Sequence, residues 1–176
     1  GRTRLLLINT PHNPTGTVLT REELTAIAEL AVERDLLVVT DEVYEHLVFD
    51  DAEHVPLASF PGMRERTVTI GSAGKTFSFT GWKVGWITAA PGLVTAVRSA
   101  KQYLTYVASG PFQYAVAQRS RCRSRTSRRS ARTCGPARGA GRGTERGGLR
   151  GLPPGRTYFI TTDIRPLGVD DGFASA

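Results

Sequence analysis

The sequence predicts an α/β fold in which helices flank a mostly parallel sheet. Three short apolar runs have the composition of strands buried on both faces: Leu5–Ile8, Leu36–Val39 and Thr67–Ile70. A stretch with helical spacing separates the first two runs, and alternation of strands with helices is typical of parallel sheets. With 176 residues, the chain is long enough for one domain with its own core.

The first helix is predicted to start at Thr20 and to run to about Arg34. Thr20 and Glu23 have the spacing of a capping box, in which the hydroxyl and the carboxylate accept hydrogen bonds from free backbone N–H groups. Apolar residues at helical spacing share one face of this helix, namely Leu24, Ile27, Ala28 and Ala31. This face is therefore expected to be the buried one.

The elements that follow the third strand complete the predicted domain. Residues from Trp82 to Ala89 suit a fourth strand that is interrupted by Gly85. Pro91 suits the first turn of a helix over about 92–107, because proline lacks an N–H that this position does not need. Residues 1–118 are thus expected to form one α/β unit.

The positive charge of the chain is concentrated in residues 119–156. This block contains 12 arginines and one acid, a net charge of +11, which leaves −4 of the overall +7 for the other residues. Its only large aliphatic residues are Leu149 and Leu152, so it is expected to be disordered for lack of apolar surface to bury. Both cysteines, Cys122 and Cys134, lie in it, and neither indicates a disulfide or a metal site.

Four polar clusters occur in order along the predicted domain, three of them directly after strands. They are Asn13–Gly16, Asp41–Tyr44, Ser72–Lys75 and Gly81–Gly85. In open α/β sheets ligands bind beyond the carboxyl ends of the strands, so the first three clusters should converge there. Each cluster alone is also compatible with an ordinary solvated turn. Their order and placement together are much more specific.

This combination resembles the class I/II aminotransferases of the fold-type I family, which depends on pyridoxal phosphate. The stretch Gly71–Trp86, GSAGKTFSFTGWKVGW, is most similar to the branch of kynurenine, glutamine and succinyldiaminopimelate aminotransferases. The resemblance covers about 1–118 and resumes at about 157–168. It implies a partial cofactor-binding large domain over 1–118 and the start of a C-terminal small domain over 157–176. We therefore expect the chain, which has no initiator Met, to be a fragment.

The resemblance implies a catalytic role for Lys75 and an electrostatic one for Asp41. Lys75 would form a Schiff base with pyridoxal phosphate, be displaced by the substrate amine, and then shuttle the proton of the substrate Cα. Asp41 would pair with the protonated pyridine nitrogen and keep the ring an electron sink. The histidines His12, His46 and His54 are expected to have no catalytic role.

Four further residues would hold the cofactor. Asn13 and Tyr44 would hydrogen-bond its phenolic oxygen, and Ser72 and Lys83 would bind its phosphate. Many relatives have arginine at the position of Lys83; lysine offers a point charge in place of a two-pronged grip. No metal ligand is predicted.

The resemblance also gives block 119–156 an interpretation, because relatives have a long helix there. Two compensating reading-frame shifts in a GC-rich gene would produce such an Arg/Gly-rich segment. The alternative is a basic arm for nucleic acid. The block lacks aromatics and interrupts a domain, so nucleic acid is not an expected partner.

The function predicted from the sequence is transfer of an amino group between an amino acid and a 2-oxo acid. Two alternatives remain open: a β-lyase of the cysteine-conjugate type, which would use the same residues, and a non-catalytic remnant of the fold. The family implies a homodimer for the complete protein. The sequence shows neither a signal peptide nor a run of 18 apolar residues, so we expect a cytoplasmic protein that does not associate with membranes.

Overall fold

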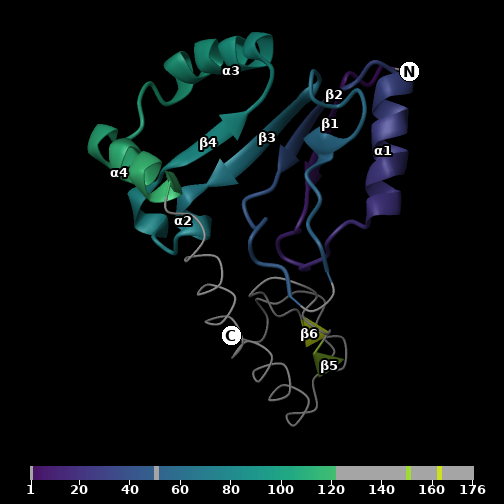
Figure 1. Cartoon of the computed structure of the whole chain (residues 1–176), viewed down its shortest axis with the longest axis horizontal. Helices are drawn as coiled ribbons and strands as arrows, with labels where there is room; N and C mark the ends of the chain where they lie inside the picture. The colour runs from purple at the N-terminus through teal and green to yellow at the C-terminus, as the bar shows by residue number, and fades with distance from the viewer. Residues whose placement is uncertain (1, 50–51, 122–149, 152–161, 164–176) are drawn as a thin grey trace.

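The central feature of the computed structural model is a four-stranded mixed sheet (Figure 1). The model describes residues 2–49, 52–121, 150–151 and 162–163. The strands lie in chain order: β1 (Leu5–Asn9), β2 (Leu37–Asp41), β3 (Thr67–Ser72) and β4 (Gly85–Thr88). The first three are parallel and β4 is antiparallel to β3. Two short strands, β5 (Arg150–Gly151) and β6 (Thr162–Asp163), form a separate antiparallel pair.

Four α-helices and two short 3₁₀ helices connect or follow the strands. The α-helices are α1 (Arg21–Glu33), α2 (Ala73–Thr76), α3 (Pro91–Leu104) and α4 (Gly110–Arg121). The 3₁₀ helices are η1 (Leu57–Ser59) and η2 (Thr80–Trp82). Helix α1 provides the crossover that two neighbouring parallel strands require, here β1 and β2. The predicted α/β class with a mostly parallel sheet is confirmed.

Helix α1 begins with the predicted capping box. The Thr20 hydroxyl accepts a hydrogen bond from the Glu23 N–H at 3.2 Å, and the Glu23 carboxylate accepts one from the Thr20 N–H at 2.7 Å. The helix ends at Glu33, with Arg34 as its C-cap. Its buried face carries Leu24, Ala28 and Ala31, as the periodicity predicted.

The main core lies between α1 and one face of the sheet (Figure 1). The residues buried there come from α1, from β2 and the residue before it, and from the segment that leads to β3: Leu24, Ala28, Ala31, Leu36, Val38, Val55, Leu57 and Met63. Leu6 and Ile8 of β1 pack against this cluster from the sheet side. The segment between β2 and β3 is therefore part of the core.

The expectation that the strands are buried on both faces is wrong for β1 and for the start of β2. Leu5, Leu7 and Leu37 are 48%, 72% and 43% exposed. Leu5 pairs with Leu37, and alternate residues of a strand point to opposite faces, so these side chains lie on the face away from α1. A run of consecutive apolar residues does not reveal whether a second layer covers it.

The predicted fourth strand is shorter than expected and begins at Gly85. Residues Thr80–Trp82 form η2, and Lys83 has a left-handed backbone (φ 53°), which ends that turn before β4. Helix α3 has Pro91 at its N-terminus, as predicted, and ends at Leu104. None of the described helices is long and apolar enough to span a membrane.

Most of the residues after α4 lie outside the described part of the chain. Helix α4 runs to Arg121, so the first residues of the predicted disordered block 119–156 are helical. The remainder of that block, apart from β5, is not described. Of the predicted strand Tyr158–Asp163 only β6 is described, and the rest of the proposed small domain at 157–176 also lies outside the described residues.

Candidate active site

The carboxyl ends of β1, β2 and β3 bring three polar residues to one edge and one face of the sheet. Asn9 and Asp41 are register partners at the ends of β1 and β2. Asp41 also pairs with Ile70, two residues before Ser72, so Asp41 and Ser72 lie on the same face. This is the face opposite α1. The structure thus places the ends of the three strands, with their polar residues, side by side.

Asn9 links the turn that contains Asn13 to the end of β2. Its amide donates to the Asp41 carbonyl oxygen at 2.9 Å, and its side-chain oxygen accepts from the Asn13 N–H at 2.9 Å. The turn closes through the Gly16 N–H, which donates to the His12 carbonyl at 2.7 Å, and Gly16 has φ 72°. Asn13 itself is exposed. The sequence analysis did not single out Asn9. The feature that could have identified it is a polar amide side chain at the end of an apolar strand.

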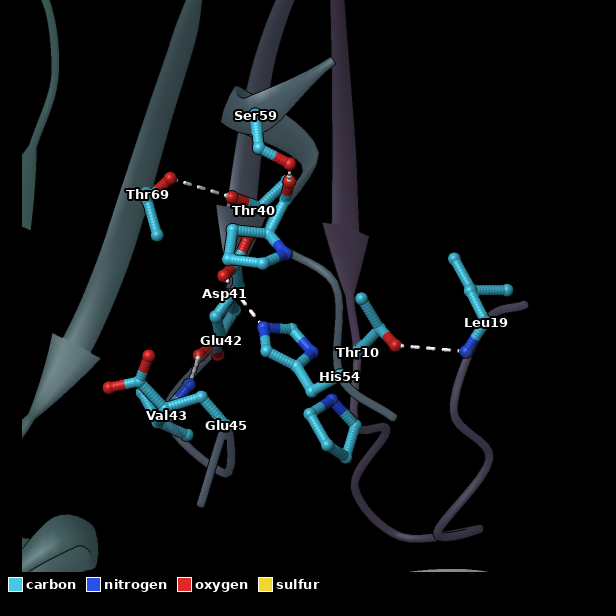
Figure 2. A network of polar contacts seen from close by, with 12 residues as sticks. Thr10, Leu19, Thr40, Asp41, Glu42, Val43, Glu45, His54, Ser59 and Thr69 are labelled. Atoms are coloured by element: carbon cyan, nitrogen blue, oxygen red, sulfur yellow. Dashed lines mark hydrogen bonds and ion pairs between the residues drawn. The ribbon is translucent and has the colours of Figure 1, made fainter. Parts of the chain in front are cut away.

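The turn after β2 holds Asp41 in a defined orientation. The Val43 N–H donates to Asp41 Oδ1 at 3.3 Å, as Figure 2 shows. The Glu42 N–H donates to the Ile70 carbonyl of β3 at 3.0 Å, which ties the turn to the neighbouring strand. Asp41 remains half-buried. A carboxylate with one oxygen held by a backbone N–H is preorganised to receive a cationic or N–H partner.

Lys75 and Tyr44 meet across this edge. The Lys75 Nζ lies 5.5 Å from the centroid of the Tyr44 ring, and Tyr44 is only 3% exposed. An amine above an aromatic face at this distance is attracted to the ring when it carries a proton. The structure thus brings together two predicted site residues that are 31 positions apart in the sequence.

Lys75 belongs to a short, tightly packed element. Helix α2 starts directly after Ser72, and the Ala73 N–H donates to the Val84 carbonyl at 3.0 Å. Ser72 pairs with Gly85, and Gly85 comes two residues after Lys83. The backbone of Lys83 therefore lies close to the Ser72 end of β3. Lys83 is exposed. A hydroxyl and a lysine near a strand end are suitable donors for an anion such as phosphate.

Gly74 is required by the packing of α2 against η2. A Cβ at this position would lie 2.8 Å from the Thr80 Cα, whereas a Cβ at Gly81 would meet nothing within 4 Å. We expect Gly74→Ala to lower the free energy of unfolding by about 1–3 kcal/mol through overpacking. Gly81→Ala, the matched control, should stay within about 0.5 kcal/mol of wild type. Urea denaturation measures both changes; equal stability of the two variants would contradict the assignment.

A cavity of about 400 Å³ is lined in part by residues of β3 and β4. Its lining includes Thr69, Gly71 and Thr88, which alternate with the residues of the Asp41 and Ser72 face. None of the six predicted site residues lines it. Its lining does include Glu42, Glu45 and Thr76, which are chain neighbours of Asp41, Tyr44 and Lys75. Within the described ranges, no group of three or more His, Cys, Asp or Glu residues could hold a metal ion.

Known proteins similar to this chain are aminotransferases. The family model described as aminotransferase class I and II matches residues 1–128. A probable N-succinyldiaminopimelate aminotransferase of Mycobacterium tuberculosis (strain ATCC 25618 / H37Rv) is 64% identical over 116 residues, which is 66% of this chain and 29% of that protein. The human kynurenine–oxoglutarate transaminase 3 is 50% identical over 117 residues, 66% of this chain and 26% of that protein.

Solved structures show the same relationship. The N-succinyldiaminopimelate aminotransferase from Mycobacterium tuberculosis superposes with a TM-score of 0.87 and 48% identity, over 98% of this chain and 45% of that one. A methionine aminotransferase from Escherichia coli has a TM-score of 0.87 and 33% identity, over 98% and 46%. The chain spans less than a third of the length of the curated relatives named above.

The resemblance to the kynurenine and succinyldiaminopimelate branch is confirmed, as is the fold-type I architecture. The family match runs ten residues past the predicted domain boundary at 118, to residue 128. These matches agree with the geometry described above, in which polar residues lie at the strand ends and the Lys75 amine lies over the Tyr44 ring. The chain belongs to the class I and II aminotransferase family.

Proposed function

We propose that this chain carries the cofactor-holding part of a pyridoxal-phosphate-dependent aminotransferase, which moves an amino group between an amino acid and a 2-oxo acid. The observation that carries the proposal is the position of the Lys75 amine over the Tyr44 ring. It lies at the strand edge that also presents Asp41 and Ser72. Members of this family generally use pyridoxal phosphate.

The donor set at this edge fits pyridoxal phosphate. Asp41 is a half-buried carboxylate with Oδ1 held by a backbone N–H, which suits a protonated ring nitrogen. Ser72 and Lys83 supply a hydroxyl and a positive charge for the phosphate. Tyr44 and Asn13 supply hydrogen-bond donors for the phenolic oxygen. When bound, this cofactor supplies an aldehyde that condenses with amines and a ring that accepts electron density.

Lys75 would have two tasks in this reaction. Its amine would hold the cofactor covalently until a substrate amine replaces it. It would then act as a general base toward the proton on the substrate Cα and, as a general acid, deliver a proton to the carbon of the cofactor's former aldehyde group. Asp41 would stabilise the positive charge on the ring nitrogen throughout. Tyr44 would keep the lysine amine at the edge where both tasks occur.

A two-step spectroscopic experiment tests this function. The 176-residue chain is loaded with pyridoxal phosphate and mixed with L-glutamate. We expect the visible band of the lysine-bound cofactor to decay to the band of its amine form, and 2-oxoglutarate to restore it. Restoration that depends on the 2-oxo acid is specific to amino transfer, since a β-lyase acting on a cysteine conjugate releases pyruvate and ammonia without it. A chain that develops no band with pyridoxal phosphate would be a non-catalytic remnant.

The homodimer implied by the resemblance and the cytoplasmic location expected from the sequence remain predictions. Which amino acid and which 2-oxo acid serve as substrates depends on side chains that contact the substrate. The first relative named above is a probable N-succinyldiaminopimelate aminotransferase, so a succinylated diamino acid is the first substrate to assay after glutamate.

A further inference from the structure

We propose that the buried pair of Glu42 and His54 is a positioning device that fixes the turn carrying Asp41 and Tyr44. This inference rests on the proposed function, because its purpose is to keep both residues aligned with Lys75. The sequence suggested no role for His54, and Glu42 was only the residue after Asp41. The structure joins them across 12 positions of the chain.

The pair is short and almost completely shielded from solvent. His54 Nε2 lies 2.8 Å from Glu42 Oε2, and the two side chains are only 5% and 2% exposed. Figure 2 shows the imidazole turned toward Glu42. Among the described residues neither Glu42 Oε1 nor His54 Nδ1 has a hydrogen-bond partner. His54 is therefore the side chain that holds the buried carboxylate, and removing it would leave a buried acceptor uncompensated.

His54 is anchored by the hydrophobic core. Val55 follows it directly, and Leu57 comes two residues later; both are buried in the cluster that α1 covers. Interiors packed in this way resist displacement, so the imidazole has a fixed position relative to the sheet. The hydrogen bond transmits that fixed position to Glu42.

Glu42 in turn fixes the backbone on both of its sides. Its N–H donates to the Ile70 carbonyl at 3.0 Å, and its carbonyl accepts from the Glu45 N–H at 2.9 Å. Asp41 lies directly before it. Tyr44, within the turn that the Glu45 N–H closes, contacts the Lys75 amine through its ring. A rotation of Glu42 about its backbone would move Asp41 and Tyr44 together.

The same turn contains a second acid–histidine pair that provides a matched control. His46 Nε2 lies 3.2 Å from Glu45 Oε1, with side chains 20% and 24% exposed. This pair is built from neighbouring residues, whereas Glu42 and His54 lie 12 positions apart in the chain. Equivalent substitutions there alter the same residue types in the same turn.

The main test variant is Glu42→Met/His54→Phe. Replacing a buried charged pair with apolar residues of similar volume is often neutral for stability, so this variant should fold while lacking the polar link. Glu42→Gln is the conservative variant, because its amide oxygen still accepts from His54 Nε2. Glu45→Met/His46→Phe is the control.

The first measurement is amide hydrogen exchange of the cofactor-free chain. In Glu42→Met/His54→Phe we expect the Val43 and Glu45 amides to exchange at least about tenfold faster, while the amides of α1 keep their rates. Glu42→Gln and the control should retain wild-type rates at both positions. Unchanged rates in the main variant would overturn the positioning role.

The second measurement is titration with pyridoxal phosphate, followed by the pH midpoint of the visible band. Loss of an outer residue that orients a binding group costs about 10- to 100-fold in affinity at metal sites, and we expect about tenfold weaker binding here, with a displaced midpoint. Glu42→Gln should restore both. Wild-type affinity and midpoint in the main variant would overturn the inference. If the wild-type chain itself takes up no cofactor, the proposed function fails, while hydrogen exchange still decides whether the pair orders the turn.

Discussion

Replacing Lys75 by alanine is expected to abolish covalent attachment of pyridoxal phosphate to this chain. The attachment needs a primary amine at the position over the Tyr44 ring, and alanine supplies none. Borohydride reduction of the loaded protein, followed by peptide mass mapping, measures the attachment directly. In the wild-type chain the label should be found on the peptide that contains Lys75. We also expect the reaction with L-glutamate to slow by about 10²–10⁴-fold, the usual contribution of a general acid–base group.

Lys101→Ala is the matched control for this experiment. The chain has only three lysines, at 75, 83 and 101. Lys101 lies on exposed α3, where its amine donates to the Thr105 hydroxyl at 2.9 Å. Its replacement should leave the label on Lys75 unchanged. A label spread evenly over the three lysines, or one that persists in Lys75→Ala, would refute the assignment of Lys75.

Asp41→Asn is expected to separate binding of the cofactor from the chemistry. Asparagine has the same shape and can still accept the Val43 N–H, so the turn should persist and the cofactor should still attach to Lys75. The negative charge that stabilises the protonated ring nitrogen is lost. Removing one such stabilising group typically costs about 10²–10³-fold in rate, which is the loss we expect for the reaction with L-glutamate.

Stopped-flow absorbance with Asp35→Asn as control makes this prediction specific. Asp35 pairs with Arg66 at 2.9 Å, but its side chain is 94% exposed and it follows α1, away from the Asp41 turn. Asparagine tolerates the left-handed backbone of this residue (φ 50°). We expect the control to react at the wild-type rate. Equal rates for Asp41→Asn and wild type would remove Asp41 from the mechanism.

Local features of the fold were predictable because neighbouring residues determine them. The capping box at Thr20 and Glu23 involves residues three positions apart, and the structure shows both of its hydrogen bonds. The buried face of α1 followed from helical periodicity. Pro91 marked the start of α3 for a similar reason, since its missing N–H is unneeded there.

The family and the order of the candidate site residues could also be predicted from the sequence. The stretch Gly71–Trp86 identified the family, and the matches confirm it. The alternation of apolar runs and polar clusters predicted that Asn13, Asp41 and Ser72 lie near the carboxyl ends of strands; Asp41 and Ser72 are in fact the last residues of β2 and β3. Their roles toward the cofactor remain predictions, which the Lys75 and Asp41 variants test.

Contacts between distant segments were decided only by the tertiary structure. No pattern in the sequence indicated that β4 runs antiparallel to β3, that Leu7 is exposed, or that His54 contacts Glu42. Strand direction, the covering of a sheet face and a buried polar pair all depend on which segments pack together. The spacing of nearby residues in the sequence determines the helices and the motifs. The alignment of Asp41, Tyr44 and Lys75 depends instead on cooperative packing of the core that anchors His54.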